Sequence, residues 1–66
     1  MTKEIFHCFG TEGFLLVDFV SYGRNKETND IDSVVVSYLN EDYELKWNDY
    51  DFCYEGLVDY QKGYIL

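Results

Sequence analysis

The chain has 66 residues, which fits a single small domain spanning residues 1–66, and its formal net charge of −8 at pH 7 disfavours direct binding to DNA, RNA or anionic lipid. Hydrophobic residues make up 47% of the sequence, too many for a disordered acidic tail, so we expect the chain to fold. A domain this small rarely gains more than about 3–5 kcal/mol from its core, which leaves a homodimer open as a source of further burial.

The first part of the chain alternates with a period of two, which is typical of strands. Residues 5–9 are predicted to form a short apolar strand, and the glycine-containing segment 10–13 supplies the positive φ angles of a tight reversal. Residues 14–22 are predicted to form the next strand, with Asp18 on its outer face. The side chains expected in the core from this strand are Leu15, Val17 and Phe19.

The middle of the chain predicts a loop followed by a hairpin. Residues 23–32 are polar except for Ile31, which indicates a solvated loop. Residues 33–39 and 43–47 are rich in β-branched and aromatic residues and flank residues 40–42, which we interpret as a three-residue turn. On the second of these strands the inward side chains are expected to be Tyr43, Leu45 and Trp47, and the outward ones Glu44 and Lys46.

Residues 48–55 fit two structures. As a strand, they would place Tyr50, Phe52 and Tyr54 inward and Asp49, Asp51, Cys53 and Glu55 outward. As a helix, they would begin at Asn48 and stop at Gly63. The aromatic residues and Gly56 lower helix stability, so the strand is preferred. Residues 64–66 are expected to close the sheet.

These elements predict a mainly β fold, a small antiparallel sheet of four to six strands. We expect the sheet to be strongly curved or barrel-like, and one short C-terminal helix within residues 48–60 is the alternative to a strand there. The chain lacks an apolar run long enough to span a membrane, and residues 1–4 do not resemble the start of a signal peptide. We therefore expect a soluble cytoplasmic protein with Cys8 and Cys53 as free thiols.

The sequence holds no pattern typical of an enzyme or of a cofactor site. There is no P-loop, dinucleotide-binding glycine pattern or nucleophile elbow. His7, Cys8 and Cys53 could offer three metal ligands, but they lack zinc-site spacing. A Cys/His nucleophilic site from adjacent His7 and Cys8 is disfavoured because neighbours on a strand point to opposite faces. We expect a non-enzymatic protein without metal or cofactor.

Acidic residues gather in the second half of the chain, interleaved with tyrosines. Residues 27–66 contain ten acidic side chains against Lys46 and Lys62, whereas residues 1–26 balance three acids with three bases. Such a surface suits a basic protein partner. The residues expected to bind it are Glu41, Asp42, Glu44, Asp49, Asp51 and Glu55, with Tyr43, Tyr50 and Tyr54 as anchors.

In composition the chain is similar to phage-encoded inhibitors that imitate DNA and to immunity proteins that neutralise nucleases. The resemblance implies an acidic protein that inhibits or regulates a basic partner, such as a nucleic-acid-binding enzyme or regulator, through a DNA-like carboxylate surface. It does not imply direct contact with nucleic acid or membrane. The alternative is a small β-rich structural or assembly module that oligomerises or docks into a larger complex.

Overall fold

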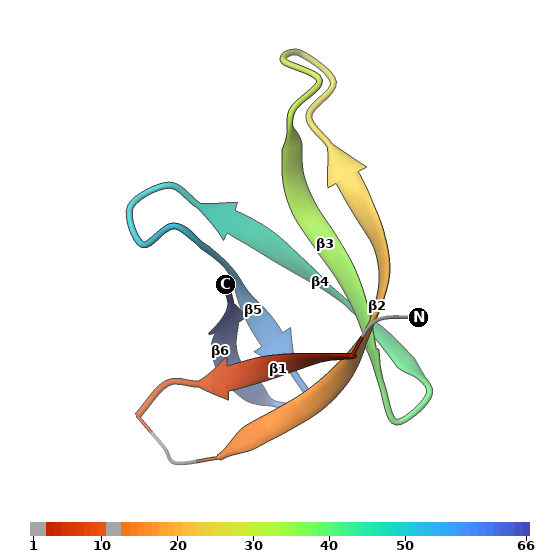
Figure 1. The fold of residues 1–66 in the computed structure, drawn as a ribbon, viewed down its shortest axis with the longest axis vertical. Helices are drawn as coiled ribbons and strands as arrows, with labels where there is room; N and C mark the ends of the chain where they lie inside the picture. The colour runs from red at the N-terminus through yellow and green to blue at the C-terminus, as the bar shows by residue number, and fades with distance from the viewer. Residues whose placement is uncertain (1–2, 11–12) are drawn as a thin grey trace.

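The computed structural model of the protein describes residues 3–10 and 13–66 and consists of six antiparallel strands. Each strand pairs with the next along the chain, and the last returns to the first, so the sheet closes into a barrel (Figure 1). The described residues include no helix. The strands are β1 (Lys3–Cys8), β2 (Phe14–Arg24), β3 (Ile31–Tyr38), β4 (Glu41–Asn48), β5 (Cys53–Val58) and β6 (Gln61–Ile65).

The barrel confirms the predicted fold class and the predicted faces of two strands. Phe6, Val17 and Leu45 are fully buried at its centre. Leu15, Phe19 and Tyr43 pack against the core as expected, and Trp47 is half-buried, whereas Glu44 and Lys46 are exposed on the other face of β4. The alternation of apolar and polar residues therefore places the side chains of β2 and β4 on the predicted sides.

The hairpin of β2 and β3 is longer than predicted. The loop expected over residues 23–32 shrinks to residues 25–30, because pairing continues to Arg24 opposite Ile31. This hairpin rises out of the barrel as the yellow and green arm in Figure 1. The reversal predicted over residues 10–13 includes residues 11 and 12, which lie outside the described residues; Gly10 has the positive φ of 66° that the prediction requires.

The turn between β3 and β4 is shorter than predicted. It consists of Leu39 and Asn40, whose φ angles are 50° and 66°, and β4 already begins at Glu41. Two successive positive φ angles are the mark of the two-residue turn that matches the twist of antiparallel strands. The expected three-residue turn over residues 40–42 is therefore wrong.

Both structures predicted for residues 48–55 are wrong over residues 49–52, which form a turn between β4 and β5. Tyr50 and Phe52 are 91% and 72% exposed instead of facing the core, whereas Cys53 lies on the same face as Glu55, as the strand prediction has it, but is only 3% exposed. The cause is local. The side-chain oxygen of Asn48 accepts hydrogen bonds from the backbone N–H groups of Tyr50 (2.8 Å) and Asp51 (3.1 Å), which stabilises a turn over a continued strand.

The barrel closes where β6 pairs with β1. This agrees with the prediction that residues 64–66 close the sheet. The pairing is short, with His7 opposite Tyr64 and Cys8 opposite Gly63. A Cβ atom at Gly63 would collide with the backbone oxygen of His7 and lie 2.7 Å from the ring of Phe6. The strands can approach this closely only because residue 63 has no side chain.

Among the described residues, no helix is long and apolar enough to cross a membrane.

Candidate functional site

The outer face of β4 carries a row of charged side chains. Asp42, Glu44 and Lys46 alternate with the inward residues of the strand, so they project from the same side of the sheet. The Lys46 ammonium lies 2.9 Å from the Glu44 carboxylate. The hydrogen bond to Glu44 raises the pKa of Lys46 above its usual value, and the charge of Asp32 adds to this effect. Both side chains of the pair are more than half exposed, so the pair contributes little to stability.

A second group of acids lies where β4 turns into β5. Glu55 stands opposite Lys46 in the strand register, and its carboxylate accepts a hydrogen bond of 3.1 Å from the amide nitrogen of Asn48. The same nitrogen lies 3.3 Å from the carboxylate of Asp51. One amide therefore holds a turn carboxylate and a strand carboxylate side by side on the outer surface.

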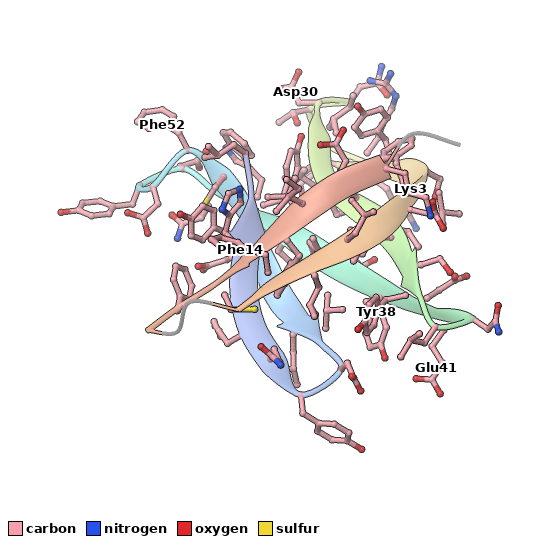
Figure 2. All side chains as sticks on the ribbon, turned by 60° about the horizontal axis from the view of Figure 1, so that its bottom comes forward. Lys3, Phe14, Asp30, Tyr38, Glu41 and Phe52 are labelled. Carbon is pink, nitrogen blue, oxygen red and sulfur yellow. The ribbon has the colours of Figure 1, made fainter. Side chains whose placement is uncertain are left out.

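The turn itself presents aromatic side chains beside these acids. Tyr50 and Phe52 are mostly exposed, and Phe52 has a φ of 53°. Figure 2 shows Phe52 projecting from the end of the molecule. Asp49 lies on the other side of the turn, where its carboxylate accepts a hydrogen bond of 2.6 Å from the indole nitrogen of Trp47. The turn is thus fixed by side-chain hydrogen bonds on both sides.

Cys53 is the first residue of β5, directly after the turn, and is 3% exposed. Burial raises the pKa of its thiol above the usual value, and the charges of Asp51 and Glu55 raise it further. The thiol therefore stays protonated at neutral pH, a state that does not act as a nucleophile. His7, on the outer face of β1, stacks on Tyr64 with ring centroids 5.2 Å apart.

Three predicted site residues lie elsewhere. Glu41 is at the opposite end of β4, and Figure 2 shows it far from Phe52. Its carboxylate accepts a hydrogen bond of 3.0 Å from the hydroxyl of Tyr43. Burial raises the pKa of Tyr43, and the nearby carboxylate of Glu41 raises it further. Tyr54 packs against the core and contacts Trp47, with ring centroids 4.8 Å apart.

The remaining predicted acids lie along the outer face of β4 and β5 and in the turn that joins these strands. We call this set the acidic surface, and it comprises Asp42, Glu44, Asp49, Asp51 and Glu55. Tyr50 stands at its edge. Among the described residues, Glu44 has an ion pair with Lys46, and no ion pair joins another member of the acidic surface to a lysine or arginine.

Sequence reasoning missed two residues of this region, Asn48 and Phe52. The sequence predicts Asn48 only as the start of the alternative helix, although asparagine before a polar segment is also a common start of a turn. Phe52 was placed in the core because it alternates with acids. The Asn48 signal was available in the sequence, whereas the exposure of Phe52 follows from the turn and could not be read from alternation.

The described residues contain no group of three or more histidine, cysteine, aspartate or glutamate side chains placed to hold a metal ion. No family model matches the chain, and no curated protein or solved structure is significantly similar to it. Inference about function therefore starts from the chemistry of the surface itself.

Proposed function

We propose that this protein is a non-enzymatic binding protein that inhibits or regulates a basic partner, such as a nucleic-acid-binding enzyme or regulator. In this proposal the acidic surface occupies the partner's Lys/Arg-lined site in place of DNA phosphates. The observation that supports it most directly is the Asn48 network, which holds the carboxylates of Asp51 and Glu55 together without a cation between them.

The spacing of the acids suits a partner built to bind a phosphate backbone. Outward side chains at alternate positions of a strand are about 6.6 Å apart, and B-DNA presents a phosphate for about every 3.4 Å of axis on each strand. Asp42 and Glu44 have the strand spacing, and Glu55 adds a charge from the next strand. Charges arranged in this way steer a basic partner toward the surface and speed its capture.

The exposed aromatic side chains would add binding energy to that of the charged side chains. Tyrosine and other aromatic residues buried at the centre of an interface often carry much of its binding energy. Tyr50 and Phe52 stand next to Asp51, and the hydrogen bonds from the backbone N–H groups of Tyr50 and Asp51 to Asn48 order the backbone of the turn before binding. Because this backbone is already ordered, a partner that covers the two rings would lose little free energy in fixing the turn that carries them.

The proposal implies that the protein is cytoplasmic, because nucleic-acid-binding partners are present in the cytoplasm. The two cysteines are free and buried, which is compatible with a reducing compartment.

The test is affinity capture with the immobilised protein and two variants of equal charge. The site variant combines Asp49→Asn, Asp51→Asn and Glu55→Gln, and the control variant combines Glu27→Gln, Asp30→Asn and Asp59→Asn. Each removes three negative charges, from −8 to −5. The amide isosteres keep an oxygen that can accept the hydrogen bonds of Asn48 and Trp47. The control changes lie in the β2–β3 loop and in the turn before β6.

At low salt, wild type and the control variant should capture the same basic protein from the cell that makes the chain, and the site variant should not. Capture should weaken steeply as salt rises, because screening acts over about 8–10 Å near physiological ionic strength. Equal capture by the site variant and wild type would overturn the proposal, as would equal loss in the control variant.

A second candidate function, a small assembly module that oligomerises or docks into a complex, is favoured by one observation. Ile5, Phe14 and Leu16 on β1 and β2 are exposed apolar side chains. Association through such side chains tolerates salt, so the salt dependence of binding separates this candidate from the first.

A further inference from the structure

The outer faces of β1 and β2 form a continuous apolar surface. Ile5 stands opposite Leu16 and His7 opposite Phe14, so these four side chains are neighbours across the two strands. His7 also stands opposite Tyr64 on β6 and stacks on its ring, and it makes a T-shaped contact with Phe14, with ring centroids 5.4 Å apart. We call Ile5, His7, Phe14, Leu16 and Tyr64 the apolar face.

Much of this face is exposed to solvent. Ile5, Phe14 and Leu16 are 50%, 65% and 57% exposed. With Phe9, which is 45% exposed and packs against Tyr64, they present on the order of 400 Å² of apolar surface, since each large side chain offers about 150–250 Å² when fully exposed. A protein interface of standard size buries about 800 Å² on each partner, of which a little over half is apolar. The apolar face therefore has the apolar area that one side of such an interface requires.

The position of the face in the barrel fits a second copy of the same chain. In the closed order of the six strands, β4 lies across the barrel from β1, and β5 lies across from β2. The centres of the apolar face and of the acidic surface are therefore on opposite sides, and the two meet along one border, where Tyr64 of the apolar face stands opposite Glu55. Two copies joined through Ile5, Phe14 and Leu16 would keep the acids of β4 and of the turn after it on the sides away from the contact.

The charges around the apolar face also fit a second copy. At the end of the face, Lys3 forms an ion pair of 2.9 Å with Asp18, which neutralises the one acid that β2 places on its outer side. At this end of the face a second copy would therefore meet a neutral ion pair, and at the border with β5 it would meet Glu55 beside Tyr64.

We propose that the protein forms a two-fold symmetric homodimer through the outer faces of β1 and β2, which leaves the acids of β4 and of the turn between β4 and β5 free. The same surface patch on both copies would meet in this arrangement, as is usual for symmetric dimers. The dimer does not depend on the proposed function, because its contact is centred on β1 and β2 and not on β4.

The experiment is sedimentation equilibrium of wild type and variants at high micromolar concentration. Wild type should have twice the mass of the 7.9 kDa chain. Leu16→Glu and the uncharged variant Phe14→Ser should be monomers that keep the strand signal in circular dichroism. Leu39→Glu adds the same charge to an exposed leucine in the turn between β3 and β4, and it should remain a dimer.

Salt provides an independent readout. Because each copy has a net charge of −8, screening should leave the dimer unchanged or strengthen it, the opposite of its effect on a basic partner. On dilution of wild type, backbone NMR shifts should change at Ile5, His7 and Leu16. A monomer at high concentration, shift changes confined to other strands, or a dimer that persists in folded Leu16→Glu and Phe14→Ser would overturn the proposal. The dilution series needs no variant, so it decides the matter even where a substitution impairs folding.

Discussion

Asn48 is the residue on which the turn between β4 and β5 depends. Its oxygen accepts hydrogen bonds from the backbone of Tyr50 and Asp51, and its nitrogen serves the carboxylates of Asp51 and Glu55. Asparagine is suited to this place because a single amide offers both an acceptor and two donors. An aspartate would keep the acceptor but add a third negative charge beside two others.

We expect Asn48→Ala to lower the free energy of unfolding by about 1–2 kcal/mol, since it removes hydrogen bonds that are partly open to solvent. Urea unfolding followed by circular dichroism measures this change. Asn48→Asp should lose less at low pH, where carboxyl groups are protonated, than at pH 7. Stability equal to wild type in Asn48→Ala would show that the turn forms without the network.

Cys53 offers a chemical probe of the same region. Its raised pKa means that less thiolate is present at a given pH than for a free cysteine, and burial blocks access as well. In a Cys8→Ser background, we expect Cys53 to react with a disulfide reagent at pH 8 far more slowly in the folded protein than in urea. The rate should increase with pH through the raised pKa. Equal rates in the folded and unfolded protein would contradict the buried position of Cys53.

The pairing of β6 with β1, which closes the barrel, is the shortest of the strand pairings and depends on Gly63. We expect Gly63→Ala to cost at least about 3 kcal/mol, because the new methyl group would meet backbone atoms that cannot move without separating the strands. Gly56→Ala is a matched comparison. Its Cβ would lie 2.7 Å from Leu45 Cδ2, the end of a side chain, and 3.1 Å from the backbone oxygen of Glu44; these contacts are less severe than the collision with the backbone at Gly63, so a smaller loss is expected. Thermal unfolding compares the two variants, and a smaller loss in Gly63→Ala would contradict this account of the closure.

At the scale of the strands, alternation in the sequence was sufficient to predict which side chains of β2 and β4 face the core. It failed at residues 49–52, where aromatic and acidic residues alternate as in a strand although the chain turns. Alternation describes the faces of an extended chain, and it carries no information on where a side-chain amide such as that of Asn48 ends the extension. The two-residue turn at Leu39 was missed because leucine rarely adopts a positive φ.

The candidate site, like the strands, could be predicted only in part from the sequence. The sequence places many acids after residue 40, but their grouping depends on register and on turns. Glu41 alternates with Asp42, so it falls on the inner side with Tyr43, at the far end of β4. The apolar face was not predicted, because Ile5, Phe14 and Leu16 belong to apolar runs in which both faces of a strand look buried. Only the register of β1 on β2 shows that one of these faces has no cover within the barrel.

At the scale of the whole molecule, the closed barrel separates two kinds of surface. The acidic surface is on β4, β5 and their turn, and the apolar face is on β1, β2 and β6; their centres lie across the barrel from each other, and they meet where Glu55 stands opposite Tyr64. Association through the first should weaken with salt, whereas association through the second should not. A dimer with two free acidic surfaces could bind two basic sites at once, and the gain in avidity would depend on the distance between those sites.

The most direct test of the proposed function is competition with DNA. The basic protein recovered by affinity capture is bound to a fluorescent DNA duplex, and this chain is added while fluorescence anisotropy is recorded at low salt. Wild type and the Glu27→Gln, Asp30→Asn, Asp59→Asn variant should release the duplex at similar concentrations. The Asp49→Asn, Asp51→Asn, Glu55→Gln variant should require at least tenfold more, equivalent to about 1.4 kcal/mol. Release of the duplex by both variants at the wild-type concentration, or a duplex that stays bound with wild type present, would contradict the proposal that the acidic surface takes the place of DNA.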